Sequence, residues 1–107
     1  MEVIICSDEQ AVGRIAADRL AKVLGRAKAP VLGVATGSTP LTTYSSLAAL
    51  AAEGKADFTD LRAFALDEYI GLPADDERSY AATIRHTVTE QLGLDPANVH
   101  TPDGMAD

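Results

Sequence analysis

Residues 31–36, Val-Leu-Gly-Val-Ala-Thr, form an apolar run that does not alternate with polar residues. A strand with one face in water alternates, whereas a strand buried on both faces reads as a continuous apolar run. Such runs are typical of parallel sheets, because the helices that connect parallel strands cover the sheet. This run therefore favours a parallel sheet with helices packed on it.

Apolar residues at steps of three and four predict helices around this run, and short apolar stretches predict further strands. The expected order is strand 2–6, helix 7–25, strand 31–36, helix 39–54, strand 61–66, loop 67–78 and helix 79–93, followed by an irregular tail with a short strand near 99–101. Alternation of this kind specifies an α/β layered domain with right-handed crossovers.

The ends of the predicted helices carry recognisable signals. Ser7 with Gln10 fits a capping box, Thr39 can cap the second helix with Pro40 at its first position, and Ser79 can cap the third. The first helix has an apolar stripe that should face the core; its members are Val12, Ile15, Ala16, Leu20, Val23 and Leu24.

Composition excludes several classes of protein. The chain has 107 residues, enough for one domain, and its net charge of −7 argues against a nucleic-acid or membrane-surface protein. One cysteine, Cys6, cannot form an intramolecular disulfide, and its apolar neighbours favour a small buried side chain. Neither a membrane span nor a signal peptide is visible, so a cytoplasmic location is expected.

A polar cluster, Thr36-Gly37-Ser38-Thr39-Pro40, joins the buried run to a helix start. Glycine lets backbone N–H groups approach an anion, and the first helical turn favours negative charge. The cluster is neither a Walker loop nor a dinucleotide fingerprint, because the lysine and the further glycines are absent. It is either an ordinary capped turn or a site for an anion.

A second polar cluster, Asp67-Glu68-Tyr69, follows the next strand. Ligands of parallel α/β sheets gather at the carboxyl ends of the strands, where both clusters are expected. Asp67 either caps a turn or, if partly buried, acts as a general base. A base beside an anion-binding loop indicates a sugar phosphate that loses a proton near its carbonyl end.

Three other polar residues are weaker candidates for a site. His86 is expected to be a solvated helix residue, and His100 lacks the neighbours of a metal site. Arg78 is expected to form a surface ion pair with Asp75 or Glu77.

The two clusters resemble the N-terminal part of glucosamine-6-phosphate deaminase. The residues that carry the resemblance are Ala35-Thr36-Gly37-Ser38-Thr39-Pro40 with Tyr44 and Leu47, then Leu66-Asp67-Glu68-Tyr69-Ile70-Gly71-Leu72-Pro73 and Ser79-Tyr80. The resemblance implies a Rossmann-like α/β fold, truncated, in which residues 1–107 are the N-terminal portion of a single sugar-phosphate isomerase/deaminase domain.

The resemblance implies a hydrolase that converts glucosamine 6-phosphate to fructose 6-phosphate and ammonia in amino-sugar catabolism, without metal or organic cofactor. By analogy Asp67 takes the C2 proton of the open-chain sugar and returns one at C1. Residues 36–39 (Thr36, Gly37, Ser38 and Thr39) match the loop that contacts the sugar phosphate, and Glu68 and Tyr69 would shape the site. The family often has glycine where this chain has Ser38.

The resemblance also implies that part of the site is absent. The family's later Gly-x-x-Gly-His segment and a phosphate-binding lysine have no counterpart in these 107 residues. Neither histidine of this chain matches that context. We therefore expect the chain alone to have little or no activity, and we leave open a homo-oligomer for the full-length protein.

Two other functions stay open at this point. The 6-phosphogluconolactonases share the fold and a similar Gly-Ser-Thr-Pro loop, but tend to have arginine where this chain has Tyr69. A non-catalytic sugar-phosphate sensor would bind the same ligand and would have no need of a base at Asp67.

Overall fold

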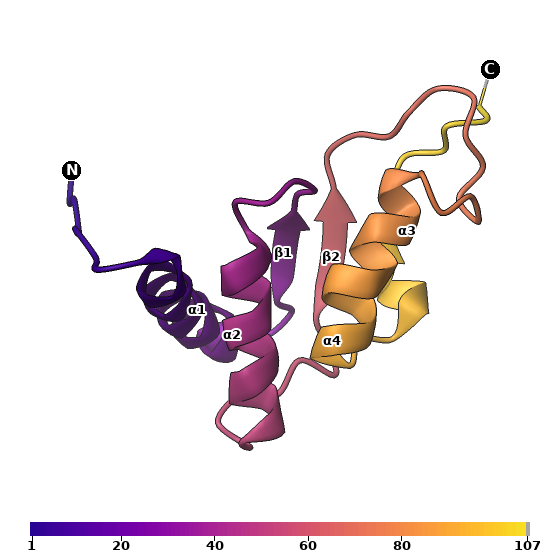
Figure 1. Cartoon of the computed structure of the whole chain (residues 1–107). Helices are drawn as coiled ribbons and strands as arrows, with labels where there is room; N and C mark the ends of the chain where they lie inside the picture. The colour runs from indigo at the N-terminus through magenta and orange to yellow at the C-terminus, as the bar shows by residue number, and fades with distance from the viewer. Residues whose placement is uncertain (107) are drawn as a thin grey trace.

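Three parallel strands form the sheet of the computed structural model, which describes residues 1–106. The strand β1 (Val31–Val34) pairs with β2 (Arg62–Ala65), and β2 pairs with β3 (Val99–His100). Val34 lies opposite Ala65, so β1 and β2 end at the same edge of the sheet (Figure 1). The predicted α/β class and parallel sheet are confirmed.

The helices follow the predicted order with small shifts at their ends. Their bounds are α1 (Glu9–Arg26), α2 (Leu41–Ala52), and a continuous helical stretch made of α3 (Tyr80–Ile84), the π-helical turn η1 (Arg85–Thr89) and α4 (Glu90–Leu92); the 3-10 turn η2 (Pro96–Asn98) leads into β3. A π-helical turn widens the helix locally, which periodicity alone does not reveal.

Only one face of the sheet is covered by helices. Leu32 and Val34 of β1 are buried, whereas Val31, which lies on the opposite face of the pleated strand, is half exposed. In Figure 1, α2 and the stretch from α3 to α4 lie in front of the sheet, and α1 packs mainly on α2. The expectation that the run 31–36 is buried on both faces is therefore wrong for this chain, since no described helix covers the other face.

The buried core lies between the covered face and the helices. Leu47 of α2 and Ile84 and Val88 of the third helical stretch are almost fully buried against the strands. Every buried side-chain nitrogen or oxygen of the described residues has a hydrogen-bond partner. The sheet and the helices that cover one of its faces therefore enclose a well-packed core.

The strand predicted over residues 2–6 is absent. This segment has no strand or helix, and Val3 and Ile5 are largely exposed. A strand needs a neighbour that accepts its backbone hydrogen bonds, and none of the described residues provides one. For the same reason Cys6 is only partly buried, not buried as predicted.

Two of the three predicted helix caps are wrong. Asp8, not Ser7, caps α1, and its carboxylate accepts the Ala11 N–H at 2.8 Å. A carboxylate also interacts favourably with the positive end of the helix dipole, which favours it over a hydroxyl. Pro40 occupies the cap position of α2, so Thr39 does not cap that helix. The cap at Ser79 is confirmed.

The apolar stripe predicted for the first helix is only partly right: Leu24 is buried in the core and Leu20 packs against it, but the other large members are not buried. Val12, Ile15 and Val23 are exposed, while Gly13, Ala17 and Leu24 are buried. A Cβ atom on Gly13 would lie 2.6 Å from the backbone carbon and oxygen of Thr42. The small residues therefore set how closely α1 approaches α2, and their spacing of four is the signal that a search for large apolar residues misses.

Replacing Gly13 by alanine should destabilise the protein, because the added methyl group forces α1 away from α2. We expect a loss of about 1–3 kcal/mol in the free energy of unfolding. Urea unfolding followed by circular dichroism measures it.

The matched control is Gly25→Ala in the same helix, where no atom lies within 4 Å of the added Cβ. This variant should be neutral or more stable by roughly 0.5–1 kcal/mol, since alanine favours the helix. Equal effects of the two substitutions would contradict the close approach at Gly13.

Candidate functional site

The loop after β1 is held at its base by a buried tyrosine. The hydroxyl of Tyr44, on α2, accepts a hydrogen bond from the Ala35 N–H and donates one to the Ala35 carbonyl oxygen, both at 2.9 Å. Burial raises the pKa of Tyr44 above its ordinary value, against the opposing effect of the Ala35 backbone. The loop therefore leaves the strand end in a fixed direction.

Beyond Ala35 the loop presents backbone N–H groups. Gly37 has φ +97°, a conformation that other residues rarely adopt, although nothing lies within 4 Å of its absent Cβ. Within residues 1–106, no protein acceptor takes the N–H groups of Gly37, Ser38 or Thr39. Thr36 is partly buried and the next three residues are exposed. Donors beside the uncapped start of α2 can bind an anion.

Glu68, in the loop after β2, is used to hold that loop on α3. Its Oε1 accepts the N–H groups of Tyr69 at 2.8 Å and Tyr80 at 2.9 Å, and its Oε2 accepts that of Ala81 at 2.9 Å. Burial acts to raise the pKa of Glu68, but the three backbone donors outweigh it and the pKa is lowered. The resemblance implied that Glu68 shapes the site around Asp67; in the structure its carboxylate holds the loop that carries Asp67 on α3.

Ser79 completes the start of α3. Its buried hydroxyl accepts the Ala82 N–H at 3.0 Å and donates to the Ala74 carbonyl oxygen at 3.2 Å. With Glu68 on the two preceding N–H groups, the first turn of α3 has its donors satisfied. Of the two helix starts at this edge, only that of α2 is available to a ligand.

Asp67 lies two residues beyond β2 and is exposed. The partial burial that would favour a general base is not found, because no described residue covers this side of the strand ends. The rings of Tyr69 and Tyr80 lie 4.4 Å apart between centroids. A hydrogen bond to Tyr69, burial, and then the charges of Asp67 and Glu68 raise the pKa of Tyr80. Asp67 thus lies near a pair of tyrosines.

A glycine near the C-terminal end supports the same loop. The Gly71 N–H donates to the Gly104 carbonyl oxygen at 2.8 Å. A Cβ on Gly104 would overlap the Tyr69 carbonyl oxygen, so only glycine fits this approach. The sequence analysis missed Gly104, and no local pattern marks it, because the contact joins segments more than thirty residues apart.

The weaker candidates lie outside these two loops. His86 is exposed, and its ring nitrogens lie 3.0 Å from Glu77 and 3.4 Å from Glu90. These contacts, Glu77 first, raise the pKa of His86. His100 stacks on Phe64, with ring centroids 4.8 Å apart.

Arg78 pairs with Asp76 at 2.8 Å, not with Asp75 or Glu77 as predicted. The two carboxylate oxygens of Asp76 receive both the Arg78 side chain and its backbone N–H, which lowers the pKa of Asp76 to about 2. Among residues 1–106, no three His, Cys, Asp or Glu side chains are grouped as metal ligands would be.

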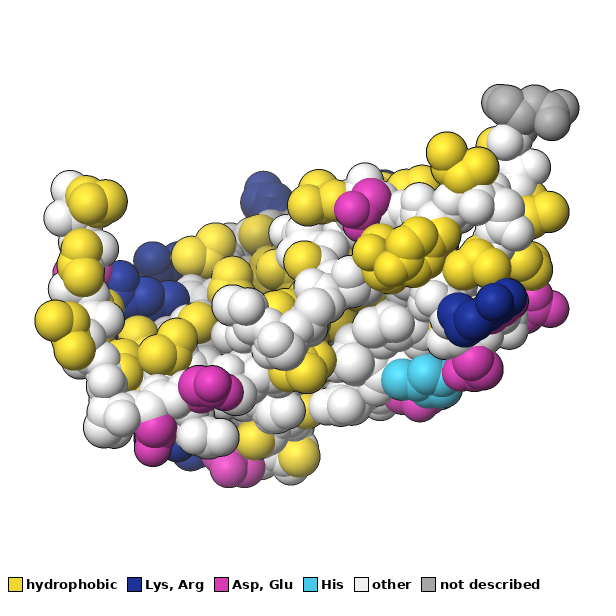
Figure 2. All heavy atoms as spheres, turned by 45° about the horizontal axis from the view of Figure 1, so that its top comes forward, with side chains coloured by type: hydrophobic (Ala, Val, Ile, Leu, Met, Phe, Trp, Pro, Cys, Tyr) yellow, Lys and Arg dark blue, Asp and Glu magenta, His cyan; other side chains and the backbone are white. Residues whose placement is uncertain are grey.

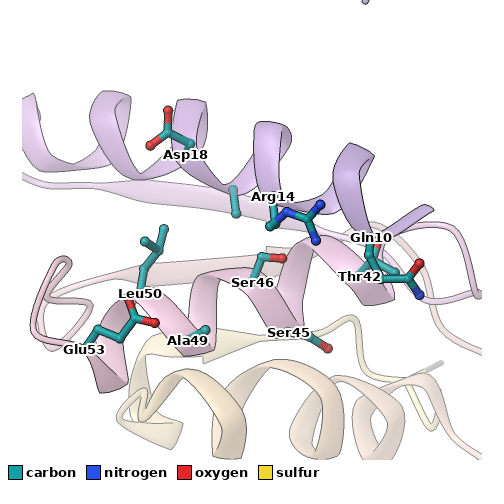
Figure 3. A pocket seen from close by; sticks show the side chains of 10 residues that line it. Gln10, Arg14, Asp18, Thr42, Ser45, Ser46, Ala49, Leu50 and Glu53 are labelled. Carbon is teal, nitrogen blue, oxygen red and sulfur yellow. The ribbon is translucent and has the colours of Figure 1, made fainter. Parts of the chain in front are cut away.

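A cleft of about 620 Å³ lies between α1 and α2 (Figure 3). Arg14 and Asp18 line it from α1, and Ser46 and Glu53 line it from α2. None of the predicted site residues lines this cleft, so it is separate from the two loops. The described helices include none that is long and apolar enough to cross a membrane.

The fold and the two loops define a class: α/β proteins in which a loop with unpaired N–H groups and a loop with a carboxylate follow the carboxyl ends of neighbouring parallel strands. Residues 7–107 match the family of glucosamine-6-phosphate isomerases and 6-phosphogluconolactonases. The chain belongs to this family.

Two similar relatives within the family are deaminases. The chain is 99% identical over 107 residues to the glucosamine-6-phosphate deaminase of Cutibacterium acnes and 46% identical over 106 residues to that of Pseudarthrobacter chlorophenolicus. It covers 41% and 40% of those proteins, so it spans well under half of their length.

Solved structures agree with this assignment. A monomeric glucosamine-6-phosphate deaminase superposes with a TM-score of 0.92 at 33% identity, covering 100% of this chain and 44% of that one. The 6-phosphogluconolactonase of Thermotoga maritima superposes with a TM-score of 0.73 at 21% identity, covering 99% of this chain and 46% of that one, and shares the fold.

Replacing Glu68 by glutamine should destabilise the protein near neutral pH, because one amide oxygen cannot replace two carboxylate oxygens that accept three N–H groups. We expect a loss of about 1 kcal/mol, as for other helix caps. The lowered pKa means that the contribution of Glu68 is complete above the pKa of the unfolded chain and disappears as the pH falls through the folded pKa.

Urea unfolding at pH 7 and pH 3 measures both effects, and the difference between the wild type and Glu68→Gln should shrink at pH 3. Glu77→Gln is the control, since Glu77 contacts only the exposed His86 ring. A difference that is constant with pH would contradict the bracing role of the Glu68 carboxylate.

Proposed function

We propose that this chain provides the sugar-phosphate loop and the catalytic base of a glucosamine-6-phosphate deaminase. The observation that carries the proposal is that a loop with free N–H groups and the carboxylate of Asp67 follow adjacent, paired strand ends. The 99% identical deaminase of Cutibacterium acnes supports the substrate.

In this proposal residues 36–39 hold the phosphorylated sugar. The N–H groups of Gly37, Ser38 and Thr39 and the nearby hydroxyls donate to its anionic or hydroxyl oxygens. Tyr44 keeps the strand end fixed, so the donors are arranged before the sugar arrives. Ser38 keeps the loop small and adds one hydroxyl donor.

Asp67 acts as the base in the proposed reaction. Its carboxylate takes the proton from C2 of the open-chain sugar, and a proton is returned at C1. As a result C1, the aldehyde carbon, becomes an alcohol carbon, and C2 reaches the oxidation level of a carbonyl as an imine. Water then adds at C2 and ammonia leaves, giving fructose 6-phosphate. The balance of one water taken up and one ammonia released makes the overall reaction a hydrolytic deamination, and it needs no metal or organic cofactor.

The residues next to Asp67 position it in this proposal. Glu68 fixes the loop on α3, and Tyr69, two residues after Asp67, packs its ring on that of Tyr80. Asp67 is exposed to solvent in this chain, so residues 1–107 alone should have little or no turnover. We propose a cytoplasmic enzyme, because its substrate is a phosphorylated sugar of central metabolism.

The family match also includes 6-phosphogluconolactonases, which hydrolyse a lactone and need no C2 base. Tyr69, where those enzymes tend to have arginine, favours the deaminase. A non-catalytic sensor remains the alternative from a different class, and it would bind sugar phosphate without dependence on Asp67.

Replacing Asp67 by asparagine in the full-length Cutibacterium acnes relative should lower ammonia release from glucosamine 6-phosphate by about 10²–10⁴-fold, since the amide cannot take a proton. Binding of the sugar phosphate should persist. A coupled ammonia assay and calorimetric titration with glucosamine 6-phosphate measure the two effects.

Asp75→Asn, an exposed carboxylate in the same loop, is the control and should keep full activity. Turnover that survives Asp67→Asn would refute the proposed base. Faster hydrolysis of 6-phosphogluconolactone than deamination would favour the lactonase, and binding without either reaction would favour the sensor.

Replacing Gly37 by alanine should weaken sugar-phosphate binding, because alanine does not readily adopt φ +97° and the loop N–H groups would turn away. In the full-length relative we expect KM to rise about tenfold, equivalent to about 1.4 kcal/mol.

Gly25→Ala is the matched control, since Gly25 is an exposed residue of α1 without positive φ and with nothing within 4 Å of its Cβ position. An unchanged KM in Gly37→Ala would show that the loop conformation is not needed for binding.

A further inference from the structure

The cleft between α1 and α2 has a size that suits a small molecule. Its volume is about 620 Å³, and ligand pockets commonly measure roughly 300–1,000 Å³. The two helices approach most closely where Gly13 lies against the Thr42 backbone, and the short side chains of Ala17, Ser46 and Ala49 leave the space beyond this contact open. None of the residues assigned to the sugar phosphate or to the base lines the cleft, so a ligand there would be a second one.

A cation is directed into this cleft. In Figure 3 the Arg14 side chain extends from α1 toward α2, beside Ser46. None of the ion pairs among residues 1–106 includes Arg14. The chain has a net charge of −7, and Figure 2 shows acidic side chains spread over the face that it draws. An arginine that pairs with none of these acids is available to the anionic group of a ligand.

The two ends of the cleft differ in polarity. Gln10 and Thr42 lie at the end where both helices begin, and Leu50 lies toward the opposite end (Figure 3). The positive ends of two helix dipoles favour negative charge at the first end, and an amide and a hydroxyl can donate hydrogen bonds there. The cleft therefore favours a ligand with an anionic head at the helix starts and an apolar body beyond it.

The two carboxylates that line the cleft indicate how much negative charge it accepts. Asp18 is turned away from α2 in Figure 3 and pairs with Lys22 at 3.1 Å. Glu53 lies at the C-terminal end of α2 and pairs with Lys55 at 3.1 Å. Both carboxylates would repel a doubly charged phosphate more than a singly charged carboxylate. The planar guanidinium of an arginine matches a carboxylate through two parallel hydrogen bonds.

We propose that the cleft binds a small monocarboxylic acid with an apolar body. The Arg14 guanidinium and the Ser46 hydroxyl donate to the carboxylate, and the body lies against Ala17, Ala49 and Leu50. This site is separate from the sugar-phosphate loop, so the proposal does not depend on the function proposed above.

The test is a nuclear magnetic resonance titration of the ¹⁵N-labelled full-length Cutibacterium acnes relative with 3-phenylpropionate. The amide signals of Arg14, Ser46 and Leu50 should shift and saturate with a Kd below about 1 mM. The neutral alcohol 3-phenylpropanol should bind at least about tenfold more weakly, because it lacks the charge that Arg14 recognises. Saturating glucosamine 6-phosphate should not displace the probe, since residues 36–39 and Asp67 lie outside the cleft.

Three variants assign the binding to the cleft. Arg14→Ala should weaken 3-phenylpropionate binding by at least about tenfold, whereas Arg26→Ala, an exposed arginine of the same helix outside the cleft, should bind as the wild type does. Ala49→Phe should abolish binding, because its ring fills the space while Arg14 stays in place. Ala49 is exposed, so this variant should fold.

Several results would overturn the proposal. Tighter binding of phenyl phosphate than of 3-phenylpropionate would refute the monocarboxylate as the ligand. The absence of saturable binding up to about 10 mM, or equal affinities of the wild type and Arg14→Ala, would refute the site. Shifts confined to residues 36–39, with displacement by glucosamine 6-phosphate, would place the probe on the sugar-phosphate loop and refute the site as well.

Discussion

The parallel register of β1 and β2 is the constraint on which the candidate site depends. Because Val34 lies opposite Ala65, the chain leaves both strands at one edge, and residues distant in sequence begin their loops from adjacent points. A shift of one residue would turn Leu32 and Val34 away from the core, so burial of these side chains fixes the register. The hydrophobic core thereby decides where the polar residues of the site can lie.

The helices then fix the direction of each loop by a different interaction. Tyr44 reaches back from α2 to both backbone groups of Ala35, whereas Glu68 reaches from its loop to the start of α3. The Glu68 contact satisfies the N–H groups at the start of α3, whereas the Tyr44 contact leaves those at the start of α2 free. Two similar strand–loop–helix units thus differ in which one can hold an anion.

The sequence predicted the order of elements and both loops, because periodicity and turn residues are local signals. It failed where distant segments decide the outcome. Residues 2–6 lack a pairing partner, Gly13 packs on α2 through its absent side chain, and Gly104 meets a loop far from it in sequence. The role of Glu68 was also out of reach, since a carboxylate in a loop can face a ligand or cap a helix, and only the position of α3 distinguishes the two.

The exposure of Asp67 and the exposure of Leu66 have the same cause. These neighbours leave the end of β2 where no described residue covers the sheet edge. A carboxylate in water is a weak base, and desolvation is what raises its affinity for a proton. Any element that covered this side of the sheet would bury the side chain of Leu66 and lie close to Asp67 beside it. Covering Leu66 and shielding the proposed base Asp67 from water would therefore be one physical event.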